Sequence, residues 1–96
     1  MGHKYTVQET ALYKAIDEIL LNDWDPIGIS NEPGARHEYY SYLPLVYDMA
    51  RNNKTAEQIG SYLFSIETNA MGIPSTLERC ISVAERILET KQKFLE

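Results

Sequence analysis

The sequence predicts an all-α fold, a compact bundle of about four helices with one long ordered loop after the first helix. Apolar residues recur at three- and four-residue spacing in each expected helix. Three of these segments follow a Ser or Thr that has Glu or Gln three residues later, which is the capping box of a helix start. No segment alternates polar and apolar residues between hairpin turns. The 96 residues have the length of one domain, residues 1–96.

The first helix is expected from about Val7 to Asn22, with Thr6 and Glu9 as its capping box. Pro26 should end it, because proline disfavours helical backbone in the preceding residue. Two prolines and two glycines then predict an ordered loop over residues 25–36. Such long loops in small domains often carry function. The apolar stripe of the helix consists of Ala11, Leu12, Ala15, Ile16, Ile19 and Leu20.

The second helix is expected from about Tyr42 to Asn52, after a short turn over residues 36–40. With Ser41 as its N-cap, Pro44 would lie in the first turn, where its missing N–H costs little. Asn52 and Asn53 suit the left-handed conformation that ends many helices.

The third helix is expected over residues 56–71, opened by Thr55 with Gln58. Gly72 suits a left-handed C-terminal residue, and Pro74 prevents further extension. The inward positions are Ala56, Ile59, Leu63, Ile66 and Ala70.

The fourth helix is expected over residues 76–94, opened by Ser75 with Glu78. We expect Cys80 to be a small buried core residue. The inward face consists of Leu77, Cys80, Ile81, Ala84, Ile87, Leu88 and Lys91.

Composition excludes several classes of protein. The longest apolar run is three residues, residues 19–21, whereas a membrane span needs about 20, so no membrane partner is expected. The N-terminus lacks the apolar core of a secretory signal, and the single cysteine argues for a reducing compartment, so the cytoplasm is expected. A net charge of −5 argues against binding nucleic acid and leaves room for a basic protein partner. Residues 1–5 and 95–96 are expected to be frayed or to be remnants of cloning.

A candidate binding surface joins the long loop to the tyrosine-rich segment after it. Tryptophan and tyrosine are enriched at protein interfaces, and the nearby acids would supply charge. The alternative is structural: Trp24 would pin the loop on the bundle, Asp25 would accept backbone N–H groups, and Tyr39 and Tyr47 would pack inward. The predicted binding residues are Trp24, Asp25, Glu32, Glu38, Tyr39, Tyr40 and Tyr42.

A second hypothesis is a small metal-dependent hydrolase, because carboxylates and an imidazole gather around this region. Their spacing fits no known ligand pattern, since the chain has neither His-Glu-x-x-His nor a pair of cysteines. No catalytic residue, metal ligand or cofactor is therefore predicted. The residues of this hypothesis are Asp23, Asp25, His37, Glu38 and Asp48.

Several motifs occur in an order that resembles a known family. They are Trp-Asp-Pro-Ile-Gly at 24–28, Glu-Tyr at 38–39, Tyr-Leu-Pro at 42–44, Ile-Glu-Thr at 66–68 and Met-Gly at 71–72. The order is similar to that of the YugE-like proteins, a family of small proteins from Bacillus and related bacteria, over about residues 5–92. The resemblance implies an all-helical bacterial cytoplasmic protein and brings no assigned activity. The family pattern often has an acid where this chain has Tyr40, and this departure weakens a carboxylate-cluster mechanism here.

Proteins with similar motifs also resemble immunity partners of secreted bacterial toxins. Together with the acidic charge, this favours a non-catalytic protein-binding module, in its sharpest form an immunity-like protein that neutralises a basic partner. A homodimer is compatible with so small a bundle.

Overall fold

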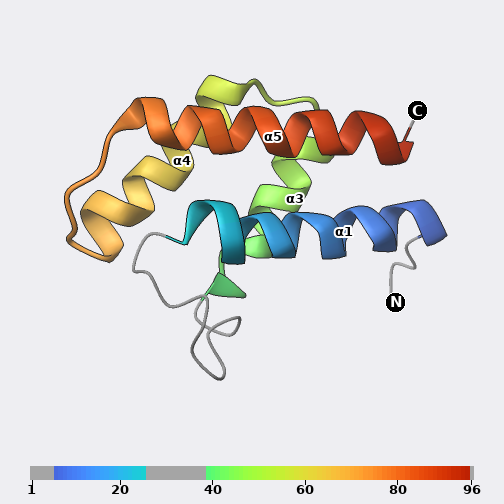
Figure 1. Cartoon of the computed structure of the whole chain (residues 1–96), viewed down its shortest axis with the longest axis horizontal. Coiled ribbons are helices and arrows are strands. Elements are labelled where there is room, and N and C mark those ends of the chain that lie inside the picture. Colours follow the sequence, from blue (N-terminus) through green and yellow to red (C-terminus); the bar gives the residue numbers. More distant parts are fainter. Residues whose placement is uncertain (1–5, 26–38, 96) are drawn as a thin grey trace.

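The structure is a computed structural model that describes residues 6–25 and 39–95, most of which are helical (Figure 1). Four α-helices and two π-helical turns, named η, occur in these ranges. Hydrogen bonds in a π-helix join residues five apart rather than four. No strand occurs in the described ranges, and the predicted all-α bundle is confirmed. In chain order the segments are α1 Val7–Ile19, η1 Leu20–Trp24, α3 Leu43–Arg51, α4 Ala56–Ser65, η2 Ile66–Ala70 and α5 Leu77–Leu95.

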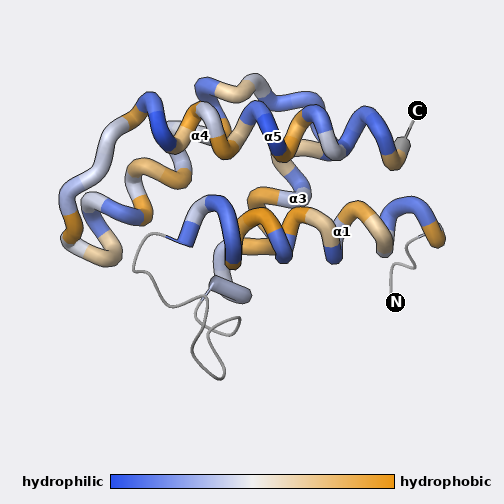
Figure 2. Tube along the Cα trace, viewed as in Figure 1, coloured by the Kyte–Doolittle hydropathy of each residue, from blue (hydrophilic) through white to orange (hydrophobic). Residues whose placement is uncertain are grey.

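The helices share one core. α5 lies beside α1, runs in the opposite direction and also packs against α4, while the shorter α3 contacts all three (Figure 1). Figure 2 shows polar and apolar residues alternating along the helices, as amphipathic helices around a common core require. The buried apolar residues are Leu12, Ile16, Ile19, Leu20, Leu21, Trp24, Tyr39, Leu43, Val46, Tyr47, Ala50, Ile59, Leu63, Ile66, Cys80, Val83, Ala84 and Ile87.

The start of α1 is fixed as predicted. The Glu9 N–H donates to Thr6 Oγ1 at 3.0 Å, and the Thr6 N–H donates to Glu9 Oε1 at 2.8 Å. The other oxygen, Glu9 Oε2, accepts from Arg51 Nη2 at 2.5 Å. One carboxylate therefore caps α1 and ties its first turn to the end of α3.

The first helical segment continues to Trp24, two residues beyond the predicted end at Asn22. Its last turn widens into η1, where the Asp25 N–H donates to the Leu20 oxygen at 3.0 Å. The wider turn accommodates three large buried side chains: Leu20, Leu21 and Trp24.

The start of α3 differs by one residue from the prediction. The N-cap is Tyr42 rather than Ser41, because the Tyr42 oxygen is the one that accepts the helical N–H of Val46, at 3.2 Å. Pro44 lies in the first turn, as predicted. Asn53 follows the helix with the expected left-handed backbone, at a φ of 62°.

The capping box of α4 is confirmed, since the Gln58 N–H donates to Thr55 Oγ1 at 3.1 Å and the Thr55 N–H donates to Gln58 Oε1 at 2.9 Å. The predicted inward position of Ala70 is wrong, because the segment changes to η2 at Ile66 and the wider turn leaves Ala70 exposed. Gly72 has the predicted left-handed backbone, at a φ of 64°.

The capping box predicted for α5 is wrong by one residue. The Arg79 N–H donates to Thr76 Oγ1 at 3.3 Å, so Thr76 replaces Ser75 as the cap. Leu77 was expected to face inward, but it is 40% exposed, since the buried face begins one turn later at Cys80.

The long loop predicted over residues 25–36 lies outside the described residues except for Asp25. Residues 1–5 and Glu96 also lie outside them. In the part of the chain that is described, no helix is both long enough and apolar enough to cross a membrane.

α4 packs closely against α5 at Gly60. A Cβ atom built on Gly60 would lie 2.7 Å from Ile81 Cγ1, 2.9 Å from Ile81 Cα and 3.0 Å from Ile81 N. Two of these three atoms belong to the backbone, so no side-chain rotation could relieve the contact. The absence of a side chain at residue 60 therefore permits this close contact between the two helices.

We predict that Gly60→Ala destabilises the fold by about 1–3 kcal/mol, because overpacking outweighs the gain of about 1 kcal/mol in helix propensity. Urea unfolding monitored by circular dichroism measures the change. Ser61→Ala is the matched control, since it makes alanine at the next, exposed position of α4 and should be within about 0.5 kcal/mol of wild type. A Gly60→Ala protein as stable as this control would contradict the close-contact interpretation.

Candidate functional site

A buried polar cluster lies where η1, η2 and the start of α5 meet. The indole of Trp24 is fully buried, and its Nε1–H donates to Glu67 Oε2 at 2.6 Å. Glu67 is itself only 2% exposed. A buried carboxylate is costly unless it is paired and hydrogen-bonded, so its partners decide whether this arrangement is tolerated.

Arg79 supplies the opposite charge from α5. Its Nη1 lies 3.3 Å from Glu67 Oε2, and its Nη2 donates to the backbone oxygen of Trp24. That oxygen belongs to the last turn of η1, where helix carbonyls lack a helical partner. One guanidinium group thus joins α5 to both π-helical turns.

Cys80 completes the cluster. Its Sγ donates to Glu67 Oε2 at 3.1 Å and lies 3.8 Å from Ser75 Oγ. Burial, and then the hydrogen bond to Glu67, raise the pKa of the Cys80 thiol from 9.0 to about 11. The thiol is therefore protonated at neutral pH and is a poor nucleophile. The predicted core position of Cys80 is confirmed, while its role as a donor to Glu67 was not foreseen.

Four of the predicted binding residues come together at the end of η1. The Tyr39 hydroxyl donates to Asp25 Oδ1 at 2.7 Å. The ring of Trp24 lies 5.4 Å from that of Tyr39 and 6.0 Å from that of Tyr42, edge to face with the latter. Because Trp24 and Tyr39 are buried, they are not themselves available to a partner, and the inward packing that the structural alternative expects of Tyr39 and Tyr47 is confirmed.

Tyr40 lies on the surface, with 43% of it exposed. It lines a hollow of about 560 Å³ between α1 and the start of α3, whose other lining residues are Tyr13, Lys14, Asp17, Glu18 and Leu43. Sequence reasoning missed the α1 residues of this hollow. In the sequence, only the position of these residues outside the apolar stripe of the first helix could have indicated that they are exposed. Of the predicted binding residues, Glu32 and Glu38 lie outside the described residues.

The residues of the hydrolase hypothesis that the structure describes are not gathered in one place. Asp23 faces Arg86, with Oδ2 at 3.6 Å from Nε, whereas Asp25 accepts from Tyr39 and Asp48 is exposed on α3. Within residues 6–25 and 39–95, no three His, Cys, Asp or Glu side chains are grouped so that they could hold a metal ion. His37 and Glu38 lie outside these ranges, and the hydrolase hypothesis stays a prediction.

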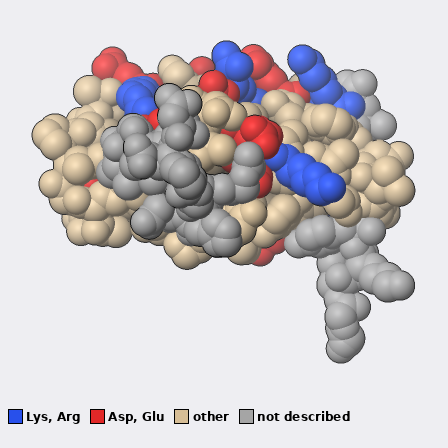
Figure 3. Space-filling model, turned by 60° about the horizontal axis from the view of Figure 1, so that its bottom comes forward, with Lys and Arg blue, Asp and Glu red and all other residues tan. Residues whose placement is uncertain are grey.

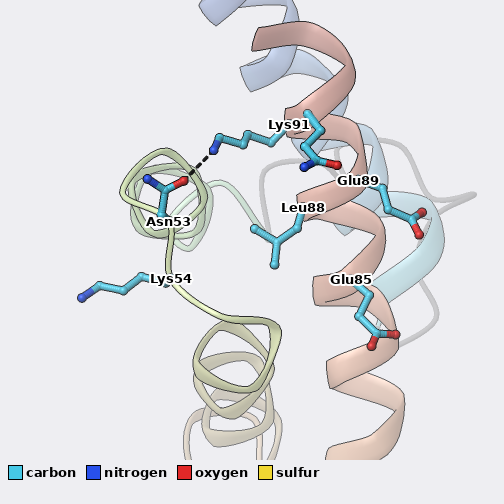
Figure 4. Close-up of a pocket in the computed structure, with 7 residues that line it drawn as sticks. Asn53, Lys54, Glu85, Leu88, Glu89 and Lys91 are labelled. Atoms are coloured by element: carbon cyan, nitrogen blue, oxygen red, sulfur yellow. Dashed lines mark hydrogen bonds between the residues drawn. The ribbon is translucent and has the colours of Figure 1, made fainter. Parts of the chain in front are cut away.

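A second hollow of about 560 Å³ lies between α5 and the turn that joins α3 to α4 (Figure 4). Lys91 Nζ donates to Asn53 Oδ1 across it at 2.7 Å. Leu88 points into the space, whereas Lys54 points away from Glu85 and Glu89. Ligand sites have polar groups that converge on one point, and the charged groups here do not.

Comparison of the chain with protein-family models, with curated proteins and with solved structures found no match.

We predict that Trp24 and Glu67 are energetically coupled. Trp24→Phe, Glu67→Gln and the double variant form a double-mutant cycle measured by urea unfolding. The coupling should be about 1 kcal/mol, because Glu67→Gln replaces the charged acceptor of the Trp24 indole with a neutral amide oxygen, and hydrogen bonds to charged groups are the stronger ones. A cycle with Glu78→Gln in place of Glu67→Gln is the control, since Glu78 is exposed. Additivity of Trp24→Phe and Glu67→Gln within about 0.5 kcal/mol would show that the bond contributes nothing specific.

The raised pKa of Cys80 predicts a fall in stability at alkaline pH. The folded protein holds the thiol proton up to about pH 11, whereas the unfolded chain releases it near pH 9, so the folded state loses stability as pH rises between these values. At each pH, the free energy of unfolding is measured for wild type and for Cys80→Ala. The tyrosines and lysines are present in both proteins, so their contribution cancels in the difference. The stability difference between the two should shrink by about 1–3 kcal/mol from pH 8 to pH 11. A difference that is constant with pH would contradict the assignment.

Proposed function

We propose that the chain is a non-catalytic protein-binding module that recognises a basic partner protein through the hollow between α1 and α3. The observation that carries this proposal is the composition of that hollow. Exposed Tyr40 lies there with the carboxylates of Asp17 and Glu18, which outnumber the one ammonium group in the lining, that of Lys14. Tyrosine offers rigid contact area with a polar hydroxyl, and acidic groups beside it favour cations.

The charge of the whole chain supports the same kind of partner. Its net charge of −5 would attract a basic protein over a distance and accelerate association. On the side of the molecule shown in Figure 3, much of the visible described surface is uncharged, and acidic side chains lie beside basic ones. A mixed surface of this kind is typical of protein interfaces rather than of phosphate-binding faces.

The buried polar cluster supports a non-catalytic role. The carboxylate of Glu67 is occupied by Trp24 and by Arg79, and the Cys80 thiol is protonated. These groups are used to hold helices together. With the resemblance to YugE-like proteins, we propose a bacterial cytoplasmic protein of the immunity-like kind, which would neutralise a basic toxin or a similar partner.

We predict that Tyr40→Ser combined with Glu18→Lys abolishes binding of the partner. The wild-type chain and the variant are immobilised and exposed to lysate of the native source, and retained proteins are identified by mass spectrometry. A stoichiometric basic protein should be retained by wild type and lost from the variant, because the variant removes the aromatic anchor and reverses a charge.

Leu45→Ser combined with Asp48→Lys is the matched control. Leu45 and Asp48 are exposed on α3, do not line the hollow, and carry the same changes in polarity and charge. The control should retain the partner as wild type does. If wild type retains no stoichiometric protein, or if both variants lose it equally while still folded, the assignment to this hollow is wrong.

A further inference from the structure

The peptide plane between Trp24 and Asp25 is held at both of its polar atoms. The Asp25 N–H donates to the Leu20 oxygen at 3.0 Å, and the Trp24 oxygen accepts from Arg79 Nη2. A peptide unit is rigid and planar, so bonds at both of these atoms fix its orientation. Asp25, which follows this plane, has a φ of 29°, a region that residues with a Cβ atom rarely adopt. The two bonds therefore hold Asp25 in a backbone conformation that is unfavourable by itself.

Asp25 transmits this constraint to the turn that carries Tyr40. Asp25 Oδ1 accepts from the Tyr39 hydroxyl at 2.7 Å, and the Tyr39 ring lies 5.4 Å from the ring of Trp24. Tyr39 also closes the backbone of the turn, because its oxygen accepts from the Tyr42 N–H at 3.1 Å. Tyr40, the next residue, is the exposed aromatic of the hollow. A continuous series of contacts thus leads from α5 to the hollow between α1 and α3.

The guanidinium group of Arg79 is itself oriented by a buried carboxylate. Its Nη1 lies 3.3 Å from Oε2 of Glu67, which is buried. Because the N–H groups of a guanidinium point in fixed directions within one plane, this contact directs Nη2 toward the Trp24 oxygen. A lysine ammonium is a compact point charge, so it could face Glu67 without holding the Trp24 oxygen in the same geometry.

We propose that Arg79 is a positioning residue of the binding hollow: by holding the Trp24 oxygen, it keeps the turn at Tyr40 in the arrangement that a partner meets. Arg79 is not among the described residues that line the hollow, so it acts through other residues. This inference rests on the proposed function, because that function makes the hollow the binding surface. Loss of the guanidinium group should loosen the turn at Tyr40 more than it loosens the core.

Amide hydrogen exchange of the ¹⁵N-labelled protein, measured residue by residue, tests the proposal without a partner. The test variant is Arg79→Lys, which keeps the positive charge. The N–H groups of Tyr42 and Leu43, which donate within the turn, should accelerate at least about fivefold more than those of Leu12 and Leu63, which lie in the core. A general loss of stability would not favour opening of the turn over opening of the core.

Arg86→Lys is the matched control. Arg86 also lies on α5, and its guanidinium group also faces η1, with Nε at 3.6 Å from Oδ2 of Asp23. The substitution is the same, but it leaves Arg79 in place on the Trp24 oxygen. The amides of the turn should therefore exchange within about twofold of wild type.

A second pair of variants keeps the test decisive if Arg79→Lys does not fold. Glu67→Gln removes the buried charge, so adding Arg79→Met to it leaves no unpaired carboxylate in the cluster. Methionine keeps an unbranched side chain with a helix propensity close to that of arginine. From Glu67→Gln to the double variant, the turn amides should again accelerate at least about fivefold more than the core amides.

Two exchange results would overturn the proposal. Equal acceleration in the turn and the core would make Arg79 a general stabiliser, and an unchanged turn would show that it is held without Arg79. A partner retained by wild type should bind Arg79→Lys at least about fivefold more weakly and Arg86→Lys less than about twofold more weakly. Equal affinity for the two variants would refute the role of Arg79 in binding. A turn loosened as expected in a protein that retains no partner would refute the proposed function alone.

Discussion

The hydrogen bond from Trp24 to Glu67 is the interaction on which the arrangement of the helices depends. It joins residues 43 positions apart, one in each π-helical turn, inside a core where an unpaired carboxylate would be strongly destabilising. Arg79 and Cys80 must therefore approach Glu67 from α5, which requires α5 to lie close to η2. The close contact of Gly60 with Ile81 provides this, because it lets α4, which leads directly into η2, pack tightly against α5.

Local signals in the sequence were sufficient for most of the fold. Thr6 and Thr55 cap their helices as predicted, since a capping box depends only on residues three apart. The errors at Ser75 and Leu77 are shifts of one residue or one turn at the start of α5, where two hydroxyl residues, Ser75 and Thr76, compete for the cap. Ala70 was misplaced for a different reason: a period of 3.6 residues does not describe a π-helical turn, and nothing in the local sequence marks the change.

The candidate site could be predicted only in part. Position 67 is four residues after buried Leu63, so the helical spacing allowed it to face inward, but a glutamate at such a position is normally exposed. Only the distant Trp24 indole and Arg79 guanidinium make its burial acceptable, and no local pattern reveals them. Similarly, Tyr40 was recognised as a surface aromatic, whereas its neighbours on α1 depend on which face of α1 meets α3. That pairing is a tertiary property.

The buried cluster and the exposed hollow are structurally connected, because buried side chains fix the turn that carries Tyr40. Beneath Tyr40, the Tyr39 hydroxyl is held by Asp25 and the Tyr39 ring lies against Trp24. The backbone of this turn is closed by two further bonds, from the Tyr42 N–H to the Tyr39 oxygen at 3.1 Å and from the Leu43 N–H to the Tyr40 oxygen at 3.3 Å. A tyrosine on a turn fixed at this many points loses little conformational freedom when it is covered, and association is favoured when ordering costs are low. Rigid support from the core thus favours the binding that we propose for this hollow.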